Sequence, residues 1–160
     1  MSNLIKIGID PSGTGTTGIV VYEDNILKKQ ILYTDKFWLN HANYILDFII
    51  DFDLIEEDCF LYIENCLYTN NNGSKDRDDL LKLLGAIDKD RYEIINWVSP
   101  KYTKSVVKNM ENLSKYNNSC LWKYDKDPDL TYQYGKGWFY NNEKISNHLR
   151  DAIIIANYER

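Results

Sequence analysis

The sequence predicts an α/β fold whose sheet starts as an antiparallel meander and continues with parallel strands. Three strand-like segments come first, at residues 4–10, 17–22 and 26–33, and only short turns separate them. After them, apolar runs alternate with segments whose apolar residues recur at helical spacing. Because such alternation is typical of parallel pairing, we expect one five-stranded mixed sheet flanked by helices.

The elements after the meander follow from the same patterns. Apolar residues at helical spacing predict a helix over about 38–49 and a second helix that Asp76 or Asp78 caps and that carries apolar residues from Leu80 to Ile87. Apolar runs at 59–64 and 92–98 predict the fourth and fifth strands. Tyr-Gln-Tyr precedes and Trp-Phe-Tyr follows a Gly-Lys-Gly sequence within residues 132–140, which predicts a small hairpin.

Length and composition fit a single domain over residues 1–160. The chain has 160 residues, and one domain takes about 150 residues. Hydrophobic residues make up 44% and charged residues 27% of the chain, which argues against intrinsic disorder. Eight aromatic residues lie between Tyr116 and Tyr140. We therefore expect an aromatic-rich insertion at about 116–142, whose aromatic residues either form a small core or stack on bases.

Several patterns that mark membrane or secreted proteins are missing from the sequence. No apolar run approaches the roughly 20 residues that span a bilayer. Residues 1–6 lack the basic and apolar regions of a secretory signal, so we expect none here. Cys59, Cys66 and Cys120 form no CxxC pair and are odd in number, which argues against a disulfide framework or a zinc ribbon. We expect no membrane partner and a cytoplasmic location, in a bacterium or in the host cell of a virus or phage.

Two motifs imitate other functions. Residues 13–18 match the GxGxxG pattern of dinucleotide-binding sites, but a strand-like segment follows where that site needs a helix, so we interpret them as a tight turn. Residues 125–129 imitate the start of a calcium loop. They lack the glycine and the closing glutamate of such a loop, so we interpret them as a solvated acidic turn.

Two acidic residues, Asp10 and Glu64, each end an apolar strand. Carboxylates are costly to bury unless they are paired or bind a metal, and ligands of open α/β sheets bind at the carboxyl ends of strands. If these two strands are parallel neighbours, the two side chains emerge together, and hard oxygen ligands suit Mg²⁺ or Mn²⁺. The alternative is that each acid only caps a loop.

A last helix, expected from Ser146 to about Tyr158, carries two more candidate ligands. His148 and Asp151 lie on one face of this helix, and the face continues with Ile155, so we expect it to point into the protein. A histidine and an aspartate together on an inward face more often serve a metal than a lone histidine does. The candidate metal ligands and catalytic residues are therefore Asp10, Glu64, His148 and Asp151.

Three motifs, taken in order, resemble those of the RuvC family of Holliday-junction resolvases, in the RNase H-like superfamily. They are Gly8-Ile9-Asp10-Pro11-Ser12 followed by Thr17-Gly18, then Tyr62-Ile63-Glu64-Asn65, then His148-x-x-Asp151-Ala152, and together they cover nearly the whole chain. The resemblance implies a sheet in the order 3-2-1-4-5, with Mg²⁺ bound by the four candidate ligands. Three departures are a longer turn after Asp10, the unmatched segment 116–142, and Leu67 in place of an aromatic residue, which makes Tyr68 the candidate DNA contact.

The resemblance also implies an activity. We expect an Mg²⁺-dependent endonuclease, with Mn²⁺ able to substitute, that cuts branched DNA such as four-way junctions by two-metal hydrolysis and leaves 5′-phosphate ends. A homodimer is expected because two symmetric cuts match the twofold axis of the junction. The sequence leaves open whether the role is DNA recombination and repair or viral DNA processing. Alternatives are another RNase H-like nuclease acting on a flap or an RNA–DNA hybrid, an inactive DNA-binding relative, and a single-domain actin-like nucleotide-binding protein.

A basic helix is the candidate DNA-binding element. The net charge of −5 hides an asymmetry, because residues 1–97 carry −8 and residues 98–160 carry +3. Ser99 and Pro100 are a strong helix start. Four lysines of this helix share a face opposite its apolar residues, and we expect Lys101, Lys104 and Lys108 to contact phosphates. The alternative is a face that is merely solvated.

Overall fold

The meander and the two later strands form one five-stranded sheet. The computed structural model describes residues 4–51, 59–66, 75–91 and 95–160. The sheet order is β3-β2-β1-β4-β5, with antiparallel pairing within the meander and parallel pairing of β1 with β4 and of β4 with β5. The predicted mixed sheet and its order are therefore confirmed. Its strands are β1 (Ile5–Asp10), β2 (Thr16–Glu23), β3 (Ile26–Thr34), β4 (Cys59–Glu64) and β5 (Ile95–Val98).

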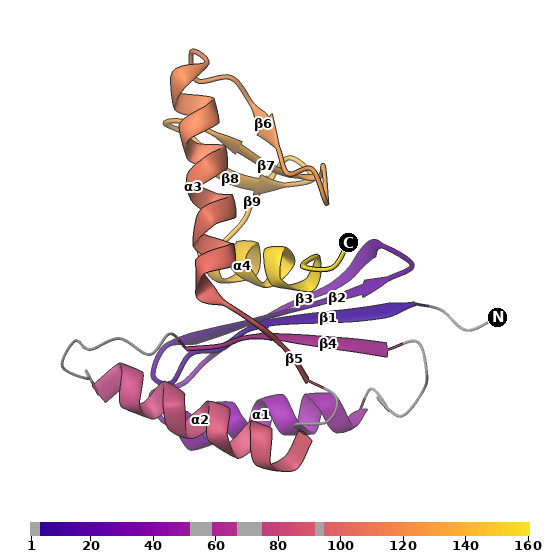
Figure 1. Ribbon diagram of the computed structural model, residues 1–160, viewed down its shortest axis with the longest axis vertical. Coiled ribbons are helices and arrows are strands. Elements are labelled where there is room, and N and C mark those ends of the chain that lie inside the picture. Colours follow the sequence, from indigo (N-terminus) through magenta and orange to yellow (C-terminus); the bar gives the residue numbers. More distant parts are fainter. Residues whose placement is uncertain (1–3, 52–58, 67–74, 92–94) are drawn as a thin grey trace.

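Helices cover both faces of this sheet (Figure 1). On one face, α1 (Trp38–Asp51) and α2 (Lys75–Arg91) bury the isoleucine and leucine side chains that alternate along β1 and β4. On the other face lies α4 (Asn147–Ala156), and α3 (Pro100–Tyr116) projects away from the sheet beside it. None of the helices in the described ranges is long and apolar enough to cross a membrane.

The helix α4 packs very close to the sheet because two glycines face it. A Cβ atom on Gly8 would lie 2.3 Å from the backbone oxygen of Ala152, and one on Gly18 would lie 2.5 Å from that of His148. Gly18 is paired with Asp10 across β1 and β2. The turn is therefore shorter than residues 13–18, because Gly18 lies inside β2, as the strand predicted over 17–22 requires, and makes room for a helix.

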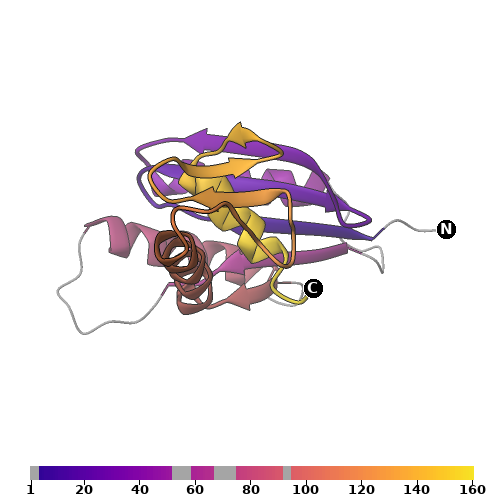
Figure 2. The ribbon, with the colours of Figure 1, turned by 90° about the horizontal axis from the view of Figure 1, so that it is seen from above.

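The aromatic-rich segment forms a second, antiparallel sheet that lies over α4 (Figure 2). Its strands are β6 (Trp122–Lys123), β7 (Leu130–Gln133), β8 (Gly137–Tyr140) and β9 (Glu143–Lys144). The predicted hairpin is present as β7 and β8, and its turn uses positive φ at Gly135 and Gly137. Tyr124, Leu130 and Trp138 are buried against Met110 of α3 and against α4, so these aromatic residues form a small core.

The acidic turn at 125–129 is not fully solvated, which corrects the sequence-based expectation. Asp127 is buried, and one of its carboxylate oxygens accepts hydrogen bonds from the hydroxyls of Tyr22 (2.5 Å) and Tyr140 (2.9 Å). Burial and the charge of Asp127 raise the pKa of Tyr22, so this hydroxyl stays a donor. Because Tyr22 belongs to β2 and Tyr140 to β8, Asp127 ties the second sheet to the first.

Replacing Asp127 with alanine should therefore destabilise the protein. We expect Asp127→Ala to lower the free energy of unfolding by about 3 kcal/mol, because the buried hydroxyl of Tyr22 and the half-buried hydroxyl of Tyr140 lose a charged acceptor. Chemical denaturation measures the loss. The matched control is Asp125→Ala, which removes an exposed carboxylate of the same turn and should change stability by no more than about 0.5 kcal/mol. Equal stabilities of the two variants would show that Asp127 does not join the sheets.

Candidate metal centre

Asp10 and Glu64 lie side by side at the carboxyl ends of two parallel strands. The register pairs Ile9 of β1 with Ile63 of β4, so the next residue on each strand is the carboxylate. Side chains two residues apart on a strand share a face. Gly8 and Tyr62 both contact α4, so Asp10 and Glu64 point toward the same helix.

The start of α4 brings the other two candidate ligands to this edge. Ser146 caps the helix by accepting a hydrogen bond from the backbone N–H of Leu149 (3.2 Å). His148 Nδ1 then lies 3.5 Å from Asp10 Oδ2. The side chain of Asp151 is 23% exposed. The expectation of an inward histidine is only partly met, because the His148 side chain is 46% exposed at the rim of the site.

The carboxylates of this group repel one another. Burial, and after it the charge of Asp10, raises the pKa of Glu64 to about 7. Burial raises the pKa of Asp151 to about 6, although the Arg150 guanidinium opposes the rise. Burial also raises the pKa of Asp10, while the hydrogen bond to Asp10 raises the pKa of His148. Three half-buried carboxyl groups with raised pKa values would be stabilised in their charged form by a cation.

The donor set fits a hard divalent cation. Three carboxylates and one imidazole supply the oxygen and nitrogen ligands that Mg²⁺ and Mn²⁺ accept. Oε2 of Glu64 is buried without a hydrogen-bond partner in the described structure, so it is free to bind a cation. As the side chains stand, no three His, Cys, Asp or Glu residues of the described ranges converge at metal-binding distance. One oxygen of Asp151 is turned to Arg150 instead.

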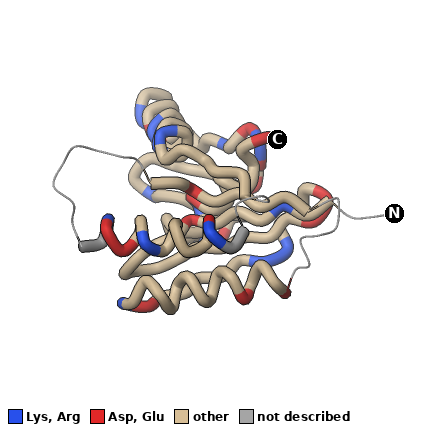
Figure 3. The backbone as a smooth tube through the Cα atoms, turned by 60° about the horizontal axis from the view of Figure 1, so that its bottom comes forward, with Lys and Arg blue, Asp and Glu red and all other residues tan. Residues whose placement is uncertain are grey.

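A groove of about 300 Å³ runs beside the carboxylates, between α3 and α4. Lys104 is close enough to Glu64 to oppose the rise in its pKa. The predicted lysine face is exposed at all four of its positions, Lys101, Lys104, Lys108 and Lys115. Met110, on the other side of α3, is buried. Figure 3 shows basic residues recurring along this helix. Residues that line the groove include Glu64, Thr103, Lys104, Lys108, Arg150 and Asp151.

The structure thus brings together Asp10, Glu64, His148 and Asp151, and it places Lys104 and Lys108 next to them. Lys101 is exposed one turn earlier on α3. Tyr68 lies outside the described residues. Two residues of the site, Thr103 and Arg150, are not predicted as site residues from the sequence. The only sequence signal for either of them is that Arg150 adjoins the predicted ligand Asp151.

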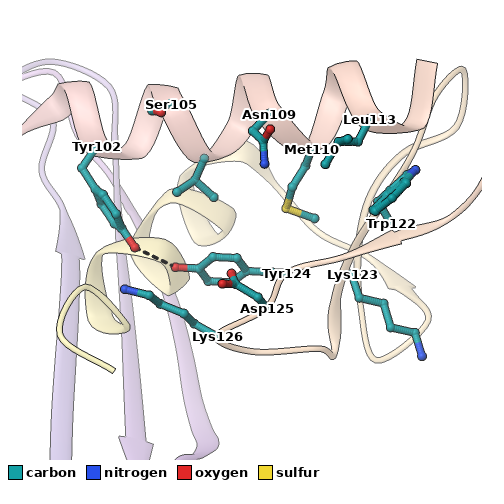
Figure 4. Close-up of a pocket in the computed structure, with 11 residues that line it drawn as sticks. Tyr102, Ser105, Asn109, Met110, Leu113, Trp122, Lys123, Tyr124, Asp125 and Lys126 are labelled. Carbon is teal, nitrogen blue, oxygen red and sulfur yellow. Dashed lines mark hydrogen bonds between the residues drawn. The ribbon is translucent and has the colours of Figure 1, made fainter. Parts of the chain in front are cut away.

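A larger hollow, of about 570 Å³, lies on the far side of α3 (Figure 4). The hydroxyls of Tyr102 and Tyr124 form a hydrogen bond of 3.1 Å there, and Lys126 Nζ lies 5.3 Å from the centre of the Tyr102 ring. Trp122 and Met110 form the other end of the hollow. Since this hollow uses the opposite edge of α3, it is separate from the carboxylates.

Comparison with known proteins identifies the fold. No protein-family model and no curated protein matches the sequence. Among solved structures, the chain is similar to Thermus thermophilus RuvC in complex with a Holliday junction substrate, with a TM-score of 0.57, 15% identity, and coverage of 96% of this chain and 90% of that one. A further structure of Thermus thermophilus RuvC has a TM-score of 0.53, 13% identity, and coverage of 96% and 92%. The chain therefore has the RNase H-like fold of these proteins.

The raised pKa of Glu64 predicts a pH-dependent cost to stability. Its folded value of about 7 exceeds the ordinary value of 4.5, so the folded state holds the proton more tightly than the unfolded chain. This contribution to stability is present below about pH 4.5 and is lost as the pH rises through 7. In metal-free buffer at pH 8, we expect Glu64→Gln to raise the free energy of unfolding by about 1–3 kcal/mol.

Urea denaturation at pH 4 and pH 8 with a chelator measures this effect. The gain in stability from Glu64→Gln should be absent at pH 4, where the Glu64 side chain of the wild type is protonated and therefore as neutral as glutamine. Glu143→Gln is the control, because Glu143 is exposed in β9. A Glu64→Gln protein less stable than wild type at pH 8 would contradict a crowded carboxylate cluster.

Proposed function

We propose that this protein is a divalent-metal-dependent endonuclease that cuts branched DNA, such as four-way junctions, by hydrolysis of phosphodiester bonds. The observation that carries the proposal is the alignment of Asp10 with Glu64 at the ends of two parallel strands, with His148 and Asp151 above them. The fold adds support, because a similar structure is that of RuvC with a Holliday junction substrate.

The four residues would hold Mg²⁺ or Mn²⁺. Bound there, the cation supplies positive charge to the reacting phosphate and lowers the pKa of water. Asp10 would be the central ligand, because it contacts His148 and its charge acts on both Glu64 and Asp151. Glu64 offers its unpaired Oε2 from the neighbouring strand. His148 at the rim completes the set, and its imidazole must be neutral to bind a metal.

The groove beside the carboxylates would receive the DNA strand. Lys104 and Lys108 line its α3 wall, and Lys101 precedes them on the same exposed face. Lysine contacts to phosphates set the position of a strand without reading its bases. This interface suits an enzyme that selects DNA by its branched shape.

A homodimer is part of the proposal. A four-way junction has twofold symmetry and needs two matched cuts, which a C2 dimer with two carboxylate clusters supplies. The activity, the dimer and the metal can each be tested on the purified protein.

Loss of any one carboxylate should abolish cleavage and leave DNA binding intact. We expect Asp10→Asn, Glu64→Gln and Asp151→Asn each to slow Mg²⁺-dependent cutting of a four-way junction by about 100-fold or more. Each change removes a charged ligand and keeps its shape. Asp47→Asn, an exposed change on α1, is the control for charge alone.

Gel assays on a junction, a linear duplex, a flap and an RNA–DNA hybrid identify the substrate. Wild-type protein should cut the junction fastest. Preference for the flap or the hybrid would replace the junction with another substrate of an RNase H-like nuclease. Absence of Mg²⁺-dependent cutting on all four would contradict the proposed function.

The lysine face should determine the salt dependence of junction binding. Each phosphate contact contributes about 0.9 to the slope of log K against log salt. We expect Lys104→Ala with Lys108→Ala to reduce this slope by up to about 2. The matched control is Lys82→Ala with Lys89→Ala, which removes two charges from exposed positions on α2, across the sheet. Parallel plots for wild type and the Lys104 and Lys108 variant would show that this face is only solvated.

A further inference from the structure

Arg150 makes an unusual set of contacts at the carboxylate cluster. Its Nε and Nη2 atoms both donate to Oδ1 of Asp151, each at 2.8 Å. Its Nη1 atom donates to Asn147 Oδ1 at 3.2 Å, and its guanidinium lies 5.0 Å from the centre of the Trp138 ring. Only 12% of the Arg150 side chain is exposed.

The surrounding structure holds the ion pair of Arg150 and Asp151 in place. Successive residues on a helix point in different directions, yet the Arg150 guanidinium contacts both Asp151 and Asn147, so its side chain lies along α4. Trp138 comes from β8 and is buried, and its ring supports the guanidinium in that position. The aromatic-rich second sheet therefore helps to hold a cation on a candidate metal ligand.

The Arg150 guanidinium lies where the carboxylate cluster requires positive charge. Arg150 acts electrostatically on Asp10 as well as on Asp151. Oδ1 of Asp151 is engaged twice by Arg150. As the side chains stand, no three His, Cys, Asp or Glu side chains in the described ranges converge for a metal. Arg150 also lines the groove that contains Lys104 and Lys108, so a phosphate in the groove gives the guanidinium an alternative anion.

We propose that Arg150 is an exchangeable counter-ion, which occupies Oδ1 of Asp151 in the DNA-free protein and transfers to a DNA phosphate when a strand enters the groove. Release of Oδ1 then makes Asp151 available to the divalent cation. Arg150 thus competes with the divalent cation for Asp151 in the DNA-free protein, and it binds the DNA strand once a strand is present. Metal binding is therefore stronger when DNA occupies the groove. This inference rests on the proposed function, because it takes the same carboxylates as metal ligands and the same groove as the DNA site.

Two binding measurements, neither of which involves cleavage, test the exchange. The first is Mn²⁺ binding to the DNA-free protein, followed by the electron paramagnetic resonance signal of free Mn²⁺. We expect Arg150→Gln to bind Mn²⁺ about fivefold or more tightly than wild type. The second is binding of a four-way junction in the presence of a chelator, where Arg150→Gln should bind more weakly and lose about 0.9 from the salt slope.

Two further variants separate the hydrogen bonds from charge alone. Arg150→Lys keeps the charge but loses the two-donor contact, so it should also bind Mn²⁺ more tightly than wild type. Arg160→Gln removes the same charge near Lys6 at the far end of β1 and should leave both affinities unchanged. Circular dichroism melting confirms that each variant is folded.

The outcomes are distinct. Opposite shifts in Arg150→Gln, tighter for Mn²⁺ and weaker for DNA, support the exchange. Mn²⁺ affinity of Arg150→Gln or Arg150→Lys equal to or weaker than that of wild type overturns it, while the proposed function still stands. If neither wild type nor any variant binds Mn²⁺, the proposed function fails and this inference fails with it.

Discussion

The site depends on how closely α4 packs against β1 and β2. Gly8 and Gly18 leave no side chain between the sheet and the helix, so backbone atoms of Ala152 and His148 occupy the space where a Cβ would be. Because Gly18 is the antiparallel partner of Asp10, this contact lies directly beside the carboxylate. A side chain at either glycine would push the helix away and separate His148 and Asp151 from the strand ends.

This packing concentrates negative charge, and the surrounding structure compensates for it. The raised pKa values of Glu64 and Asp151 show that the folded protein holds these acids against their preference for water. His148 and Arg150 neutralise part of the charge from the same helix. The second sheet supports this arrangement in two ways, since Trp138 lies against Arg150 and Asp127 anchors the sheet to Tyr22 of β2. The carboxylate cluster therefore lowers the stability of the fold at the site where catalysis is proposed.

Much of the fold could be predicted from local sequence. The strands of the main sheet and the starts of α3 and α4 follow from periodicity and caps that act over a few residues, and the structure confirms them. The juxtaposition of Asp10 with Glu64 followed from assuming parallel neighbours. The packing role of Gly18, the burial of Asp127 and the contacts of Arg150 could not be predicted. Gly18 and Asp127 depend on partners far along the chain. The position of Arg150 depends on Trp138 of the second sheet, whose packing against α4 no local pattern reveals.

The central claim is that the carboxylates at the ends of β1 and β4, together with the start of α4, form a divalent-cation site. The most direct measurement is X-ray diffraction from crystals soaked in Mn²⁺, because manganese scatters anomalously and its position can be mapped without reference to activity. The account predicts an anomalous peak between Asp10 and Glu64 that is lost in Asp10→Asn crystals. A peak only at other surface carboxylates, with none at these strand ends, would contradict it.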